Sequence, residues 1–192
     1  MTTYPVQTRR WTRKEYHRLA ELGVLREDEP IELIGGQLIV AEPKGTPHAT
    51  MVEVVADVLR GAFGPGWAVR AQNPIALDDD SEPEPDVFVV PGRQRDYLAD
   101  HPSQPVLVVE VADSSLALDR RHKGSAYARA GITDYWIVNL VDRVLEVYRQ
   151  PVEDAHADFG WSYADVTTIQ PGAAIAPLAR LEVAVAASDL VP

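Results

Sequence analysis

Three charged side chains in the middle of the chain have the types and the order that hydrolytic chemistry needs. Asp86 directly precedes the apolar run Val87–Val90, Glu110 interrupts the apolar run 106–111, and Lys123 follows in a charged stretch. Carboxylate oxygens bind Mg²⁺, and an ammonium group can orient or acidify a neighbouring water. Two carboxylates and a lysine therefore suit metal-assisted phosphodiester hydrolysis. The pattern is weak by itself, because a structural ion pair between Glu110 and Lys123 is an alternative explanation.

Glu110 stands where a buried strand requires an apolar residue. Residues 106–109 form a continuous apolar run, which is typical of a strand covered on both faces of its sheet. Burying an ionised carboxylate without a partner costs several kcal/mol or more. We therefore expect Glu110 to be protonated, paired with a cation or bound to a metal ion.

The stretch after this strand is expected to be a helix that Ser114 or Ser115 caps. Asp119, Lys123 and Tyr127 follow at successive steps of four, so the spacing predicts that all three share one helical face.

Glu32 and His48 are weaker candidates when only the local pattern is considered. Strand alternation places Glu32 opposite Ile31 and Leu33, which favours a solvent-facing side chain. His48 lies in the first turn of an expected helix, where a hydrogen-bonded structural histidine is more common than a catalyst. A basic stretch near the N-terminus is either a phosphate-contacting arm or, as is usual for such runs, a solvated helix face; its residues are Arg9, Arg10, Arg13, Lys14 and Arg18.

Apolar periodicity and turn residues predict the elements that must position these side chains. We expect helices over residues 12–22 and 46–61 and from Ser115 to Gly131, and a hairpin over 31–43 that turns at Gly35-Gly36. The other expected strands are 67–77, 87–90, 106–111, 135–139, 144–150, 161–169 and 180–185. The acidic, proline-rich stretch 78–85 is expected to be a solvated loop. Strands 106–111 and 135–139 flank a helix, which predicts parallel pairing through a right-handed crossover.

Length and composition limit the class of protein. The 192 residues are 46% hydrophobic, which predicts one globular domain over residues 1–192. The absence of cysteine excludes a thiolate zinc site and a cysteine nucleophile, and is compatible with a cytoplasmic protein. We see no secretory signal and no run of ~18 to 20 apolar residues, so no membrane attachment is expected. The formal net charge of −11 argues against broad polyanion binding, although a local basic groove or a bound cation would change this.

Several motifs together resemble the Uma-two family of restriction-endonuclease-like proteins, a branch of the PD-(D/E)XK nuclease superfamily. They are IELIGGQLI, His48, Pro85-Asp86-Val87, VLVVEVADSS, the series Asp119, Lys123 and Tyr127, and GITDYWIVN, in that order between residues 12 and about 148. The resemblance implies an α/β (α+β) fold with a restriction-endonuclease-like core, in which helices flank a central mixed β-sheet.

The resemblance also implies roles for individual residues. Asp86 and Glu110 would be metal ligands and Lys123 the catalytic lysine, with Glu32 helping to bind or position the metal. The backbone carbonyl of Val111 is expected as a further ligand. Tyr127 either hydrogen-bonds within the site or packs on the sheet, and we favour the site.

One position departs from the wider superfamily. There the lysine lies two residues after the second acid, where this chain has Ala112, so Lys123 must take its place from the helix.

The resulting hypothesis is an endonuclease that depends on Mg²⁺, with Mn²⁺ as a substitute, and that cuts nucleic acid, with DNA favoured. A homodimer is expected only by analogy with symmetric nucleases. Two alternatives remain open: a catalytically silent nucleic-acid-binding or protein-interaction module with a nuclease fold, and a hydrolase of small phosphate esters in a closed pocket.

Overall fold

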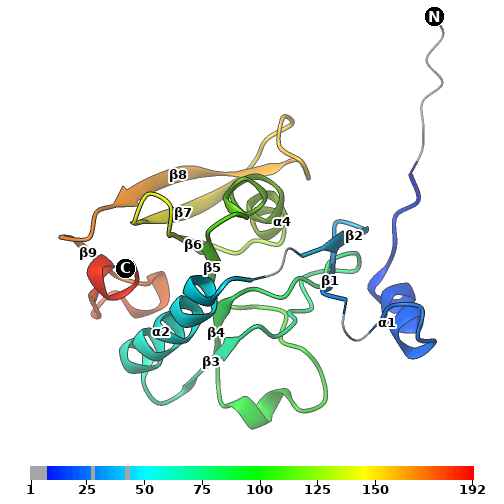
Figure 1. Ribbon diagram of the computed structural model, residues 1–192, viewed down its shortest axis with the longest axis horizontal. Coiled ribbons are helices and arrows are strands. Elements are labelled where there is room, and N and C mark those ends of the chain that lie inside the picture. Colours follow the sequence, from blue (N-terminus) through cyan, green and yellow to red (C-terminus); the bar gives the residue numbers. More distant parts are fainter. Residues whose placement is uncertain (1–7, 27–28, 42–43) are drawn as a thin grey trace, which may run out of the picture.

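The computed structural model describes residues 8–26, 29–41 and 44–192, and a mixed six-stranded sheet lies at its centre (Figure 1). Its order is β3-β4-β5-β6-β7-β8, in which only β5 and β6 pair in parallel. The helices are α1 (Arg13–Glu21), α2 (Thr46–Phe63), α3 (Leu116–Leu118) and α4 (Gly124–Arg129), with a π-helical segment at Asp119–Lys123 and 3₁₀ turns at Gln94–Tyr97, Leu178–Arg180 and Ala187–Asp189. The strands are β1 (Ile31–Ile34), β2 (Gln37–Val40), β3 (Trp67–Ala71), β4 (Val87–Pro91), β5 (Leu107–Ala112), β6 (Asp134–Asn139), β7 (Val144–Glu153), β8 (Trp161–Ile169), β9 (Ala174–Ile175) and β10 (Val185–Ala186).

Most expected elements near the candidate residues are confirmed. The hairpin turns at Gly35-Gly36, and the parallel register pairs Glu110 with Ile137. The predicted end of the hairpin at residues 42–43 and the N-terminal residues 1–7 lie outside the described residues. No helix in the described ranges is long and apolar enough to cross a membrane.

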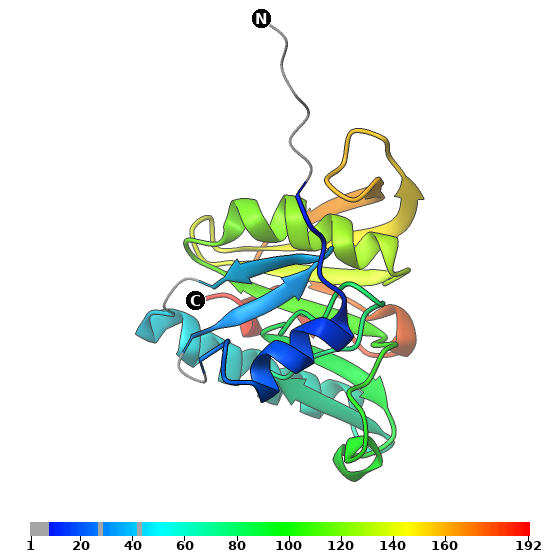
Figure 2. The ribbon, with the colours of Figure 1, turned by 90° about the vertical axis from the view of Figure 1, so that its right-hand side faces the viewer.

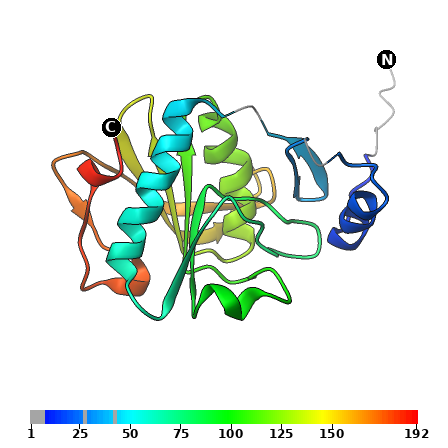
Figure 3. The ribbon, with the colours of Figure 1, turned by 60° about the horizontal axis from the view of Figure 1, so that its bottom comes forward.

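Alternation along the strands divides the core into two layers. Val109 and Val111 of β5 face a cluster built with α2 and the C-terminal segment, whereas Val108 and Ala112 face a cluster built with α4 and Ile34 of β1. Figure 3 shows α2 lying across its face of the sheet. Glu110 shares the parity of Val108 and Ala112, so its side chain points into the α4 layer, where the helical residues can reach it.

The β1–β2 hairpin stands beside the main sheet as a separate two-stranded unit and packs toward α4 (Figure 2). Gly35 at its turn has φ +56°, and a Cβ there would lie 2.0 Å from the ring of Phe159. A larger residue would therefore force the hairpin away from the loop between β7 and β8. Glycine at this position permits the close packing that holds β1 over the cavity.

The expectation of a solvated acidic loop at 78–85 is wrong for several of its carboxylates. Glu82 is buried and accepts hydrogen bonds from Arg13 at 2.8 Å and pairs with His17 at 2.7 Å, which anchors α1. Arg129 of α4 binds Asp78 and Asp80, each at 2.6 Å. The backbone of this segment also pairs with the hairpin, because the N–H of Glu82 donates to the Leu33 carbonyl at 2.7 Å. The loop is therefore the connector between α1, the hairpin and α4.

Three other expectations need correction. The helix after Ser115 is not uniform: the turn at Asp119–Lys123 is π-helical, which widens it relative to the α-helices on either side. The strand expected over 67–77 ends at Ala71, and the strand expected over 180–185 is reduced to Val185–Ala186. In the C-terminal segment, the sequence ARLEVAVA alternates between apolar and other residues, which predicts a strand. Most of it forms no strand, and its apolar side chains pack into the core cluster that also contains residues of α2.

Arg120 does not belong to the candidate site, because its guanidinium is bound to Glu146 of β7. Arg120 Nε donates to Glu146 at 2.9 Å, and Asn139 and Tyr148 donate to the same carboxylate at 2.7 Å each. Burial favours the neutral acid, but these contacts hold the pKa of Glu146 below its ordinary value.

We expect Glu146→Gln to lower the free energy of unfolding at pH 7 by about 1 to 2 kcal/mol, because it removes a charged acceptor from this network. A lowered pKa in the folded state means that the stabilisation is present above the unfolded-state pKa and is lost as pH falls through the folded-state pKa. Urea denaturation should therefore show the difference from wild type shrinking below about pH 4. Glu153→Gln, on the exposed end of the same strand, is the control, and a pH-independent difference would contradict the prediction.

Candidate functional site

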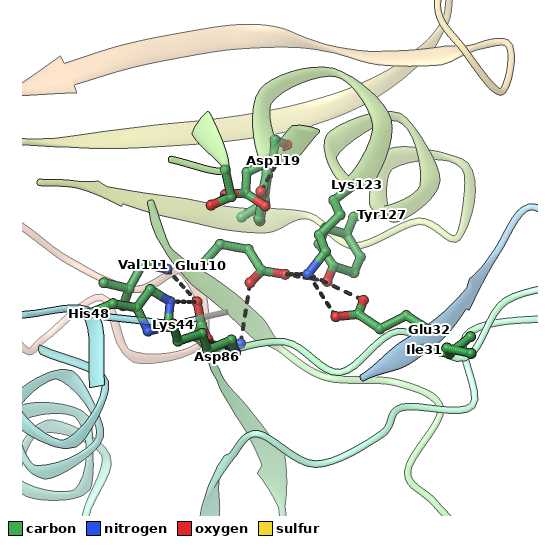
Figure 4. A network of polar contacts seen from close by, with 12 residues as sticks. Ile31, Glu32, Lys44, His48, Asp86, Glu110, Val111, Asp119, Lys123 and Tyr127 are labelled. Atoms are coloured by element: carbon green, nitrogen blue, oxygen red, sulfur yellow. Dashed lines mark hydrogen bonds and ion pairs between the residues drawn. The ribbon is translucent and has the colours of Figure 1, made fainter. Parts of the chain in front are cut away.

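Glu32, Asp86, Glu110 and Lys123 line one cavity of about 640 Å³ beside the carboxyl end of β5, whereas Val111 and Tyr127 lie behind its wall and reach the site through Asp86 and Glu110. Glu32 comes from β1, Asp86 immediately precedes β4, Glu110 lies on β5, and Lys123 ends the π-helical segment. Figure 4 shows these side chains pointing toward one another from their separate elements. Residues up to 91 positions apart in the chain thus meet in this cavity, with Glu32 and Lys123 in direct contact.

Lys123 is the centre of the buried network. Its Nζ lies 3.1 Å from Glu110 Oε1 and 3.3 Å from both carboxylate oxygens of Glu32. Tyr127, one turn further along, donates its hydroxyl hydrogen to Glu110 Oε1 at 2.7 Å. The side chains of Lys123 and Glu110 are only 9% and 2% exposed, so their charges have almost no access to solvent. The ion pair considered in the sequence is therefore present, and it includes a second carboxylate.

Asp86 forms the other half of the network. Its Oδ2 accepts a hydrogen bond from the Val111 backbone N–H at 2.9 Å and lies 3.0 Å from His48 Nε2. Its Oδ1 lies 2.7 Å from Lys44 Nζ. The backbone N–H of Asp86 points to Glu110 Oε2 at 3.3 Å, which joins the two halves.

The surroundings shift the two central carboxyl groups in opposite directions. Burial raises the pKa of Glu110, although the positive charge of Lys123 opposes this. Burial also disfavours ionisation of Asp86, but the hydrogen bond from His48 and the charge of Lys44 hold the pKa of Asp86 well below its usual range. The neighbouring carboxylates, Glu110 first among them, outweigh desolvation and raise the pKa of Lys123, so its ammonium stays charged. The contacts of Asp86 thus favour its ionised form, whereas burial of Glu110 favours its protonated form against the opposing charge of Lys123.

Asp119 lies in the same cavity but makes a different contact from Lys123 and Tyr127. It accepts a hydrogen bond from the Ser115 hydroxyl at 2.5 Å, and burial raises its pKa to about 6. The expected shared face therefore holds for Lys123 and Tyr127, which both reach Glu110, while Asp119 lines the cavity nearer the start of the helix. Ser115 has no capping hydrogen bond to the backbone, because its side chain is used for Asp119.

The chemistry of the donors suits a hydrated divalent cation better than an all-protein metal cage. Among the described residues, no group of three or more His, Asp or Glu side chains is placed to hold a metal ion together. Asp86, just before β4, lies beside Glu110 of the adjacent strand β5, and both line the same cavity. Mg²⁺ keeps several waters and needs only one or two protein carboxylates, so this pair fits it. Carboxyl groups on the cavity wall also outnumber ammonium groups, since Glu32, Asp86, Glu110, Asp113 and Asp119 face only Lys44 and Lys123.

Local sequence patterns missed or undervalued part of this arrangement. Lys44 precedes α2 and belongs to no recognisable motif, and its contact with Asp86 arises only from the fold. Glu32 does not face solvent as strand alternation suggests: it is buried, and the Lys123 ammonium lies 3.3 Å from its carboxylate. Val111 contacts Asp86 through its N–H. The metal-binding role of its carbonyl, like the catalytic roles of Asp86, Glu110, Lys123, Glu32 and Tyr127, stays a prediction.

Comparison with known proteins agrees with this architecture. Residues 13–185 match the Uma2 family, described as "Putative restriction endonuclease". The chain belongs to this family. A solved structure described as "a putative nuclease belonging to DUF820" from Anabaena variabilis is 17% identical, with a TM-score of 0.65 over 90% of this chain and 96% of that one. This likeness confirms the expected fold of a mixed sheet flanked by helices. No match was found among curated proteins.

The buried network predicts strong energetic coupling between Lys123 and Glu110. We expect Lys123→Met to lower the free energy of unfolding by about 3 kcal/mol, since it leaves buried carboxylates without their cation. The double variant Lys123→Met/Glu110→Gln should be more stable than the sum of the single changes predicts, with a coupling of about 1 kcal/mol or more. Urea denaturation at pH 7 measures all three.

Lys14→Met serves as the control for the change of charge, because Lys14 is exposed on α1. Additive effects of the two buried substitutions would show that Lys123 and Glu110 do not stabilise one another.

Proposed function

We propose that this protein is a metal-dependent endonuclease that hydrolyses phosphodiester bonds in nucleic acid, with DNA as the favoured substrate. The observation that carries the proposal is the meeting of Asp86, Glu110 and Lys123 in one cavity. Membership of a family described as putative restriction endonuclease supports the same reaction class. The lysine reaches the site from the helix, in place of the strand position that Ala112 occupies.

Asp86 and Glu110 would hold the divalent cation, Mg²⁺ or Mn²⁺. When bound, it would neutralise charge on the scissile phosphate and make water a better nucleophile. The excess of carboxyl groups on the cavity wall supports this need for a cation, because a phosphate would otherwise meet net negative charge. A bound divalent cation would also lessen the local repulsion between this chain, whose formal net charge is −11, and a polyanionic substrate.

The protein's own groups have separate tasks in this proposal. Lys123, held by Glu110 and Glu32, orients the attacking water and stabilises negative charge as it develops on the phosphate oxygens. Tyr127 fixes the orientation of Glu110 through its hydroxyl. His48 and the Val111 N–H fix the orientation of Asp86. Glu32 is a positioning residue for the lysine.

We expect wild-type protein to nick supercoiled plasmid with Mg²⁺ or Mn²⁺, and Asp86→Asn, Glu110→Gln and Lys123→Ala each to lower the rate by about a hundredfold or more. Glu146→Gln is the matched control, because it neutralises a buried carboxylate outside the cavity and should cleave at the wild-type rate. Gel assays on plasmid, single-stranded DNA and RNA measure the rates, and far-UV circular dichroism confirms folding. Equal cleavage by all variants would show that the nuclease activity does not come from this site.

A catalytically silent nucleic-acid-binding module is the second candidate. It is favoured by the occupation of both Asp86 oxygens, by Lys44 on one and by His48 and the Val111 N–H on the other. In that case the protein would retard nucleic acid in a gel without metal and cleave none of it. Hydrolysis of bis(4-nitrophenyl) phosphate without cleavage of any polynucleotide would instead indicate a small-ester hydrolase.

A further inference from the structure

Lys44 lines the cavity and has no role in the mechanism proposed above. It lies just before α2, and its ammonium is 2.7 Å from Asp86 Oδ1. The same side chain lines the site cavity and a second cavity of about 430 Å³, which shares Glu32 and Ala41 with the first. Lys44 therefore stands where the two cavities adjoin.

The two ammonium groups of the cavity are held in very different ways. Lys123 is 9% exposed and contacts two carboxylates, whereas the side chain of Lys44 is 37% exposed and forms an ion pair with Asp86. A buried ammonium between two carboxylates cannot move away without leaving both negative charges buried and uncompensated. A partly exposed lysine on a flexible four-carbon stem can move into water at small cost.

The contacts of Asp86 indicate which of its oxygens would accept a cation. Oδ2 is engaged by the Val111 N–H and by His48, both from well-buried parts of the fold. Within the described ranges, Oδ1 has Lys44 alone as its hydrogen-bond partner. A divalent cation on Oδ1 would face the lysine ammonium at close range, and the repulsion between them would be strong in a partly desolvated cavity.

We propose that Lys44 is a displaceable counter-ion, which neutralises Asp86 until a divalent cation binds and then contacts the phosphate of the substrate. This inference rests on the proposed function. Lys44 and Lys123 are the lysines on the cavity wall within the described residues, and Lys123 is held by Glu110 and Glu32. Once released from Asp86, the Lys44 ammonium is the cavity cation free to meet an incoming phosphate. The exchange keeps Asp86 paired throughout, so a buried carboxylate is never left uncompensated.

Metal binding by the full chain without nucleic acid tests the displacement directly. We expect isothermal titration calorimetry with Mn²⁺ to give a dissociation constant about tenfold lower for Lys44→Met than for wild type, because the metal no longer displaces a charged hydrogen bond. Lys44→Arg should bind no more tightly than wild type. Lys14→Met, with the same change in net charge on exposed α1, should leave the affinity unchanged.

Adding Asp86→Asn to Lys44→Met should abolish the gain in affinity, which would place the exchange at this carboxylate. In the plasmid assay at saturating Mn²⁺, Lys44→Met should cleave about tenfold more slowly than wild type despite tighter metal binding, because the phosphate contact is lost. Lys44→Arg should retain most of the rate.

Equal Mn²⁺ affinity in wild type, Lys44→Met and Lys14→Met would overturn the inference. Absence of binding in all of them would overturn both the inference and the proposed metal dependence. Tighter binding by Lys44→Met in a protein that cleaves no nucleic acid would support the displacement at Asp86 and refute the nuclease proposal, so the two can fail separately.

Discussion

The burial of a glutamate in the middle of the sheet constrains the rest of this structure. Glu110 lies on β5 between apolar neighbours and is 2% exposed, so its carboxyl must be neutral or closely compensated. Lys123 and Tyr127 supply that compensation, and both come from the helical segment that crosses from β5 to β6. The crossover must therefore lie on the face toward which Glu110 points. The same contact closes one side of the cavity.

The position of the β1–β2 hairpin depends on a second set of charges. Arg129 of α4 holds Asp78 and Asp80, and the segment around them pairs with the hairpin through the Leu33 carbonyl. This chain of contacts ties the hairpin to the helix that carries Lys123. Glu32 consequently arrives within 3.3 Å of the same ammonium that binds Glu110. The acidic segment 78–85 thus lies outside the cavity wall, but it holds in place the hairpin that contributes Glu32 to the cavity.

The electrostatics of the cavity connect these structural constraints with the proposed chemistry. Asp86 stays ionised because of its contacts with His48 and Lys44, whereas burial favours the protonated form of Glu110. Because Asp86 favours its ionised form and Glu110 its protonated form, binding of a cation would change the net charge of this pair of carboxyl groups. A bound divalent ion would stabilise the ionised form of Glu110, and it would compete with Lys44 for Asp86. Metal binding at Asp86 and release of Lys44 from this carboxylate would then be coupled.

The amino-acid sequence by itself determined the main elements and the central pair of residues. Apolar runs with β-branched residues predicted β4, β5 and β6, and the cost of a carboxylate inside such a run predicted that Glu110 needs a partner. These predictions succeed because strand pattern and desolvation are local properties. Helical spacing placed Tyr127 on the face of Lys123, and the family motifs added Glu32, which strand alternation had directed toward solvent.

Only the tertiary structure decided what the remaining polar residues contact. The pairing of Lys44 and His48 with Asp86 joins positions about 40 residues apart, and no periodicity encodes such a contact. Strand alternation predicted a solvent-facing Glu32, because it cannot reveal that Lys123, 91 positions further along the chain, lies against this carboxylate. The acidic stretch 78–85 looked solvated for the same reason, since Arg13 and Arg129 reach it from distant elements. Whether a charged side chain is buried depends on the elements that pack around it, and a local sequence pattern does not reveal those neighbours.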